Sequence, residues 1–333
     1  MVKYILKRLL LSIFIMVGVS MIIYFMIRLM PMDFVTQKFN TLASTGKLSD
    51  ERLEELKAIY GLADNSFGGI LKGYFSWLGA FIKGDLGTSF KYSEPVENII
   101  LDNMGVSFGI AFVSLILELI IAIPLGIKCA VNQYGKLDYT ATVLAMTLTA
   151  FPAFFLGNIF IMLFADKLGW FDPSLGLQST TLEIGASGWV KFGDMLWHLV
   201  LPMVVLVLLN IGSYMRYQRT NTLEVLSADY IRTARAKGLS EGKVIYKHVF
   251  RNTMIPLVTV MASTLPMLFG GAMITETVFN IKGIGKITYD ALIEGDIPLA
   301  MGYNMFIAIL TVIGILLSDV MYAVVDPRVK LGK

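Results

Sequence analysis

The sequence is poor in cysteine, histidine and charge. It has one cysteine, Cys129, and two histidines, His198 and His248, in 333 residues, and charged side chains make up 16% of it. A single cysteine excludes an internal disulfide and a metal site built from cysteines. Two histidines so far apart in the sequence do not indicate a metal centre. We therefore predict that the chain binds no metal.

The sequence also lacks a nucleotide-binding phosphate loop. No stretch fits the pattern G-x-x-x-x-G-K-[S/T], whose backbone cradles phosphates and whose hydroxyl contacts Mg²⁺. The string Gly-Ile-Gly-Lys at 283–286 has neither the spacing nor the hydroxyl. We predict that this chain has no catalytic residues, binds no cofactor and does not hydrolyse ATP. Energy from ATP would have to come from a partner.

Apolar residues, by contrast, are abundant. They make up 56% of the sequence, and the mean hydropathy is +0.68. A single water-soluble core could not bury this many apolar side chains. A bilayer core needs about 20 apolar residues per helix. Six stretches meet this requirement: 9–27, 105–127, 139–165, 199–215, 254–275 and 297–318. We predict an all-α polytopic membrane protein whose six transmembrane helices lie at 1–30 and near 105–128, 139–165, 196–217, 254–277 and 297–324.

Lysine and arginine near the predicted spans gather on one side of the membrane. They precede the first span and follow the second, eight of them lie between residues 216 and 251, and Arg328, Lys330 and Lys333 end the sequence. Such residues stay preferentially in the cytoplasm. We predict a multi-pass protein of the cell membrane with both termini cytoplasmic. The net charge of +3 follows from this bias, so no nucleic acid partner is expected.

Residues 31–100 would form a small extracytoplasmic domain between the first two spans. Asp50 begins a predicted helix that Gly61 ends, and an apolar patch follows at 74–81. The patch could lie on the membrane or pack on that helix. The segment could cap the outer mouth, receive a soluble partner, or simply cover the tops of the helices.

Residues 222–252 predict two short amphipathic helices joined by a turn at Gly238. One apolar face would comprise Leu223, Leu226, Tyr230, Ile231 and Ala234, and the other Val244, Ile245 and Val249, with Ser240 capping the second helix. The periodicity leaves open a basic helix lying on anionic lipid headgroups.

Several motifs in the chain resemble those of ABC importer permeases. The run Ala-Asp-Tyr-Ile-Arg-Thr-Ala-Arg-Ala-Lys-Gly at 228–238 looks like the EAA loop of that family, closest to its oligopeptide and dipeptide branch. The resemblance includes 84–89, 123–126, 270–272, 276–279 and 326–328. Arg232 and Thr233 stand where the general EAA pattern has Glu and Ala, a difference that is usual in the peptide branch. At Lys282 that branch often has proline.

The resemblance implies the type I ABC importer permease fold, with its core at 97–323, in a bacterial or archaeal cell membrane. It implies import of oligopeptides or dipeptides with a second homologous permease subunit, two cytoplasmic ATPase subunits that carry ATP and Mg²⁺, and an extracytoplasmic substrate-binding protein. Relatives of this branch also carry nickel chelates or glutathione. The loop at 222–252 would be the coupling element, through Asp229, Arg232, Ala234, Arg235, Ala236, Lys237 and Gly238.

Polar residues inside spans are the candidates for the transport pathway, because a charge within the bilayer is unfavourable and usually faces protein or water. They are Glu118, Asn158, Asn210 and Asn304. Glu118 could instead pair helices with a partner subunit. An ion-coupled secondary transporter would need repeated halves and an ionisable site at the bilayer midplane. Glu118 is the one candidate for such a site. An intramembrane enzyme would need a catalytic pair or metal ligands, and the sequence offers neither.

Overall fold

The computed structural model describes residues 2–30, 34–35, 38–39, 50–59, 62–173, 175–183, 185–270 and 272–325. Helices and loops make up these residues, with one isolated β-bridge between Thr88 and Pro95. The helices are α1 (Val2–Arg28), α3 (Asp50–Ile59), α4 (Phe67–Ile82), α5 (Val96–Val131), α6 (Lys136–Ala150), α7 (Ala153–Phe160), η1 (Ile161–Lys167), α8 (Gly188–Leu226), α9 (Asp229–Ala236), α10 (Glu241–Lys243), η2 (Val244–Val249), α11 (Phe250–Gly270), α12 (Met273–Val278), α13 (Ile284–Glu294) and α14 (Ile297–Val325).

Four helices, α1, α5, α8 and α14, are long and apolar enough to cross a membrane, and α6 with α7–η1 makes a fifth if that bent pair is one span. The remaining expected span, 254–277, falls mainly on α11, where many side chains lie outside the described residues. With 36 and 39 residues, α5 and α8 exceed the roughly 20 that a bilayer core requires. Their ends therefore extend beyond it.

The expected span at 139–165 differs from a continuous helix. It is bent by 100° between α6 and α7. Phe151 has an extended backbone (φ −74°, ψ 135°) ahead of Pro152, which takes the cap position of α7. Proline lacks the amide N–H and disfavours helical geometry in the residue before it, which explains a break here. Pro124 and Pro202 lie inside α5 and α8 without ending them.

The apolar patch at 74–81 packs on the first span. The Tyr74 ring meets the Tyr24 ring of α1 edge-on, and the Tyr74 hydroxyl donates to the Val17 carbonyl at 3.0 Å. Tyr74 is fully buried in a cluster that also includes Ile70 and, from α14, Met301. The sequence left open contact with the membrane or packing on the helix at 50–59; the structure instead packs Tyr74 of α4 on α1, while Phe75 stays exposed. Helix α3 begins at Asp50 as predicted, and Gly61 lies outside the described residues.

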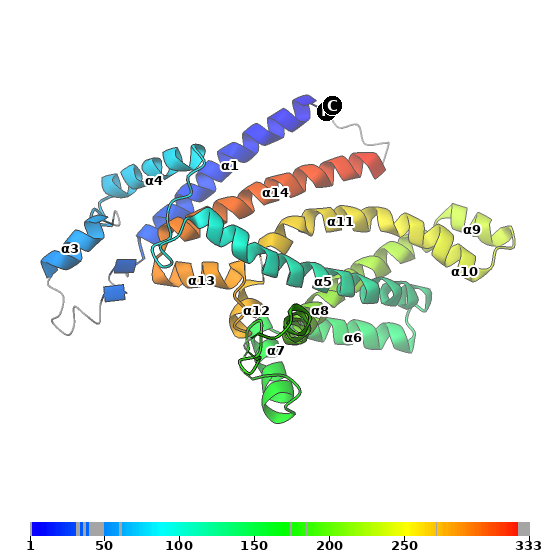
Figure 1. The fold of residues 1–333 in the computed structure, drawn as a ribbon. Coiled ribbons are helices and arrows are strands. Elements are labelled where there is room, and N and C mark those ends of the chain that lie inside the picture. The colour runs from blue at the N-terminus through cyan, green and yellow to red at the C-terminus, as the bar shows by residue number, and fades with distance from the viewer. Residues whose placement is uncertain are drawn as a thin grey trace.

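The long helices α1, α5, α11 and α14 run lengthwise along the molecule, whereas the short α7 runs across it (Figure 1). Helices α3 and α4 lie at one end, and α9 and α10 at the other. The first turn of α1 and the last turn of α14 both lie toward the α9–α10 end. In the middle, α5 and α8 pack closely: a Cβ built on Gly126 would lie 2.7 Å from the Met215 carbonyl oxygen. A larger residue at 126 would force these two helices apart.

Candidate coupling and translocation sites

A hairpin formed by α9, α10 and η2 occupies the predicted coupling loop. Ile231 and Ala234 of α9 pack against Val244 and Val249 of η2, and all four are buried. The predicted pair of amphipathic helices is therefore present, with its own small apolar core. A headgroup-bound helix would instead keep its apolar side free for lipid.

Two details of the hairpin prediction are wrong. Tyr230, expected on the buried face, is 48% exposed. The reason is that α8 ends at Leu226 and Ala228 is extended, so the helical phase restarts at α9 instead of continuing from Leu223. Ser240 takes the cap position of α10, but its side chain makes no capping hydrogen bond.

The turn between the two helices depends on Gly238. Its φ is +74°, a left-handed conformation that other residues adopt at a cost. The Gly238 amide donates to the Arg235 carbonyl at 2.9 Å, and the Leu239 amide donates to the Ala234 carbonyl at 3.4 Å. This pair of bonds is the Schellman arrangement that ends a helix at glycine. Leu239 follows at once and joins the apolar core of the hairpin.

The tip of the hairpin presents a largely basic surface. Of the seven predicted coupling residues, Ala234 is buried and the other six are exposed: Asp229, Arg232, Arg235, Ala236, Lys237 and Gly238. Arg235 Nε donates to Glu241 Oε1 at 2.7 Å, which ties α9 to α10 across the turn. Ala234 thus supports the hairpin from inside, and the exposed residues form the surface that a partner can reach.

Polar side chains that the sequence did not predict as contacts tie α8 to α11 and to α6 near the hairpin. Gln218 of α8 is fully buried, and its Nε2 donates to Thr253 Oγ1 of α11 at 2.8 Å. Next to it Arg219 pairs with Asp138 of α6 through two hydrogen bonds of 2.6 and 2.7 Å. These partners are 35 and 81 residues apart in sequence, so no local sequence pattern predicts their contacts.

Two of the four pathway candidates come together. Asn210 Nδ2 of α8 donates to Glu118 Oε1 of α5 at 3.2 Å, beside a cavity of about 260 Å³. The other two bond within their own helices: Asn158 Nδ2 donates to the Phe154 carbonyl and Asn304 Nδ2 to the Ala300 carbonyl. The cavity is lined by Ala111, Ser114, Leu115, Glu118, Leu206, Asn210, Tyr214, Thr264, Leu268 and Ala272.

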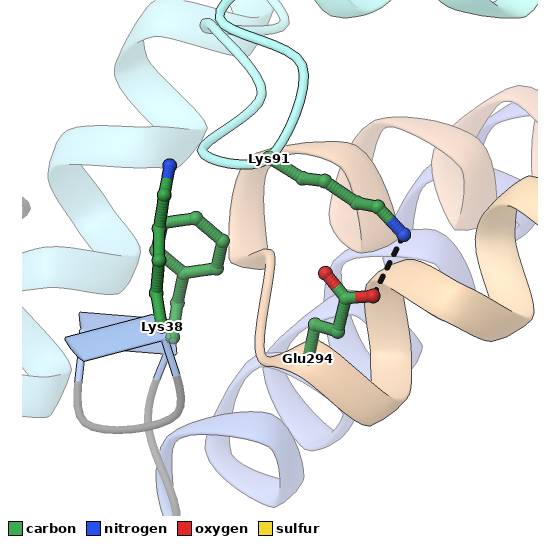
Figure 2. A pocket seen from close by; sticks show the side chains of 4 residues that line it. Lys38, Lys91 and Glu294 are labelled. Carbon is green, nitrogen blue, oxygen red and sulfur yellow. Dashed lines mark hydrogen bonds and ion pairs between the residues drawn. The ribbon is translucent and has the colours of Figure 1, made fainter. Parts of the chain in front are cut away.

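A second pocket lies at the opposite end from the hairpin and has a volume of about 360 Å³ (Figure 2). Lys38 and Lys91 approach it from opposite sides, and Lys91 Nζ donates to Glu294 of α13 at 2.7 Å. Burial acts to lower the pKa of Lys91, but the hydrogen bond to Glu294 and the nearby carboxylates outweigh it, so this pKa is raised.

The loop that carries the Gly-Asp-Leu-Gly-Thr-Ser motif at 84–89 is hydrogen-bonded to the start of α14. Asp296 is fully buried, and its Oδ2 accepts from Ser89 Oγ at 2.5 Å and from the Lys91 amide at 3.0 Å. Its Oδ1 accepts from the Leu299 amide in the first turn of α14. One carboxylate therefore fixes the loop and caps the helix.

Glu276 holds the turn between α12 and α13 in place through hydrogen bonds. Its carboxylate accepts from Ser107 Oγ of α5 at 2.7 Å and from the Lys286 amide at the start of α13 at 3.0 Å. The Ser107 oxygen in turn accepts from the Ile284 amide. These bonds fix the turn that contains Lys282, although it lacks the proline that the peptide branch often has there. They give Glu276 a structural role.

Ser179, in the loop before α8, meets Asp194 and His198 of α8, but the three do not form a catalytic triad. Ser179 Oγ donates to Asp194 Oδ1 at 2.6 Å, while its distance to His198 Nε2 is 3.0 Å. In a triad the imidazole lies between carboxylate and hydroxyl and accepts the hydroxyl proton. Here the serine is bonded to the carboxylate itself. No group of three metal-ligating residues occurs in the part of the chain that the structure describes.

Known proteins with similar sequences are membrane components of transport systems. The family model described as binding-protein-dependent transport system inner membrane component matches residues 122–331. The oligopeptide transport system permease protein AppB of Bacillus subtilis is 36% identical over 331 residues, which are 99% of this chain and 100% of that protein. The dipeptide transport system permease protein DppB of Escherichia coli K12 is 32% identical over 348 residues and covers both chains fully.

A solved structure shares the fold. The MetNI methionine ABC transporter, in an inward-facing conformation, matches with a TM-score of 0.54 and 19% sequence identity, over 70% of this chain and 99% of that chain. At this identity the likeness concerns the fold, which confirms the predicted type I permease class. The chain belongs to the family of binding-protein-dependent transport system inner membrane components.

Proposed function

We propose that this chain is one of two membrane-spanning subunits of an ATP-driven importer that carries oligopeptides or dipeptides into the cytoplasm. The relatives named as oligopeptide and dipeptide permeases match over the whole chain, which supports peptides as the substrate class. The observation that carries the proposal is the hairpin, which has a closed apolar core and an exposed basic tip.

The hairpin is connected to two long helices in a way that suits force transfer. Only Ser227 and Ala228 separate α8 from α9, and η2 runs directly into α11 at Phe250. The Gln218–Thr253 bond links α8 to α11 just behind the hairpin. A partner that moves the tip therefore tilts both helices together, and the cavity beside Glu118, which both helices line, changes with them.

The energy comes from a pair of cytoplasmic ATPase subunits. They bind ATP and Mg²⁺, while this chain binds no cofactor and no metal and performs no catalysis. The exposed residues Arg232 and Lys237 contact these subunits. This places the α9–α10 end in the cytoplasm, and with it both ends of the chain.

The opposite end of the molecule, with α3, α4 and the Lys38–Lys91 pocket, is then extracytoplasmic (Figure 1). It receives the substrate-binding protein. A second, homologous permease completes the pathway across the membrane, and lipid surrounds the apolar faces of both.

Reconstitution into proteoliposomes tests the proposal. The permease pair and its ATPases are inserted, and uptake of a radiolabelled tripeptide is followed with the binding protein outside. We expect uptake that requires ATP and the binding protein and continues in the presence of an uncoupler. Uptake without ATP that an uncoupler abolishes would instead identify an ion-coupled secondary transporter, and uptake of a nickel chelate or glutathione alone would change the substrate class.

A further inference from the structure

The cavity beside Glu118 contains an acidic group that forms no ion pair with the part of the chain that the structure describes. Glu118 is 4% exposed, and among the described residues its carboxylate accepts one side-chain hydrogen bond, from Asn210. The ion pairs of the described residues include none with Glu118. Buried carboxylates are normally paired with a cation or with several donors. This one faces open space instead.

The same cavity contains a second unsatisfied group. Ser114 lies one helical turn before Glu118 on α5, is 2% exposed, and its Oγ has no hydrogen-bond partner among the residues that the structure describes. Thr264 Oγ1 donates its proton to the Met261 carbonyl and also bonds the Tyr214 hydroxyl, which lines the same cavity. The polar side of the cavity is therefore rich in acceptors.

A carboxylate with several hydroxyl and amide oxygens suits an ammonium group, which offers three N–H donors and one positive charge. A bare Ca²⁺ ion would need six to eight oxygen ligands, mainly carboxylates and carbonyls, and the cavity has a single carboxylate. The rest of the lining is apolar, from Leu115, Leu206 and Leu268 among others. Such a lining fits the carbon skeleton beside an amino group.

The size of the cavity limits what enters. At about 260 Å³ it is smaller than the roughly 300–1,000 Å³ of pockets that enclose drug-sized ligands. It can hold one terminal residue and not a whole oligopeptide. The α-ammonium group is common to all unmodified peptides, so a site for it would accept peptides of any sequence.

We propose that Glu118, with Ser114 and Asn210, binds the α-ammonium group of a peptide during its passage. The inference rests on the proposed function for its substrate class. It adds to that function a defined site and a defined end of the substrate. Peptides whose amino terminus is acylated lose this interaction.

Thiol protection in the assembled complex tests the site directly. In a Cys129→Ala background, A111C places the only cysteine of this chain in the cavity lining without removing a proposed ligand, and its alkylation by N-ethylmaleimide is timed. We expect alanyl-alanine amide to slow alkylation at least about fivefold, N-acetyl-alanine amide to leave it unchanged, and E118Q to abolish the protection. Equal protection by both peptides, protection that persists in E118Q, or none at all would overturn the proposal.

A transport measurement covers the case in which A111C is not assembled. Uptake of a tripeptide with a free amino terminus is compared with uptake of its N-acetyl form, each at saturating binding protein. We expect E118Q to lower the ratio of the two rates about tenfold, and the isosteric control T147V on α6 to leave it unchanged. An equal loss for both peptides would indicate a structural role and refute the inference. Absence of any ATP-driven peptide uptake by the unaltered complex would count against the proposed function instead.

Discussion

Replacing Gly238 tests whether the geometry of the hairpin turn matters for coupling. A Cβ built on Gly238 meets nothing within 4 Å, so Gly238→Ala introduces no clash. The φ of +74° remains, and an L-residue adopts this conformation at a cost of about 1–2 kcal/mol. Asparagine tolerates it better, so Gly238→Asn should be milder. The penalty acts on the turn alone.

Gly242 provides the matched control. It lies four residues further along the same hairpin, also has open space around its Cβ, and has no positive φ. It is part of α10, where alanine is preferred to glycine. Gly242→Ala should therefore leave the hairpin as stable as before, or slightly more stable.

Hydrogen–deuterium exchange of the hairpin amides measures the effect in the assembled complex. A cost of about 1–2 kcal/mol corresponds to opening that is roughly 5–30-fold more frequent in Gly238→Ala. In the same samples we expect fewer peptides imported per ATP hydrolysed, with Gly238→Asn intermediate and Gly242→Ala unchanged. If Gly238→Ala and Gly242→Ala exchange at the same rate, the turn does not carry the strain argued here. If exchange rises while the import ratio stays constant, the hairpin is not the coupling element.

Three further substitutions test hydrogen bonds and an ion pair that hold helices and loops together. Asp138→Asn removes the charged partner of Arg219, and we expect unfolding in detergent to become about 2 kcal/mol easier, seen as a lower midpoint of thermal unfolding; an unchanged midpoint would contradict this. Asp296→Asn weakens the acceptor of Ser89, so proteolysis of the outer loop at 83–95 should accelerate several-fold while the hairpin amides exchange as before. Tyr74→Phe removes a buried hydroxyl that bonds α4 to α1, for an expected loss of about 1 kcal/mol; equal stability would show that the ring alone holds α4.

The local features of the hairpin were predictable because they depend on neighbouring residues. The spacing of Ile231 and Ala234 places them on one side of a helix, and Gly238 is the residue that the left-handed turn requires. Tyr230 was misplaced because the break between α8 and α9, at Ser227 and Ala228, carries no glycine or proline. Where the phase of a helix restarts is decided by packing, and periodicity then gives the wrong face.

The break at Pro152 shows that a proline in an apolar run does not by itself predict whether the helix ends there. Pro124 and Pro202 lie in similar apolar runs, and there the helices continue. The difference does not lie in the local sequence. Close packing of α5 on α8, for which Gly126 leaves room near Pro124, supports a helix through its proline.

The polar contacts between spans could not be predicted individually. Glu118 and Asn210 are 92 residues apart and meet because α5 and α8 pack side by side. Asn158, Asn210 and Asn304 each bond a carbonyl of their own helix, and of these three Asn210 also bonds Glu118. Hydropathy shows that a polar residue lies in a span, but only the packing decides whether its side chain faces a cavity.

The central claim is that the exposed tip of the hairpin contacts the ATPase. A cysteine cross-link tests it most directly: Ala236→Cys in a Cys129→Ala background, with a short bifunctional thiol reagent, in membranes that contain the assembled and ATP-hydrolysing complex. Tyr134→Cys, exposed in the loop between α5 and α6, is the control. The account predicts a specific cross-link from position 236 to an ATPase subunit, with a yield well above that from position 134. No cross-link from position 236 in an active complex would contradict it.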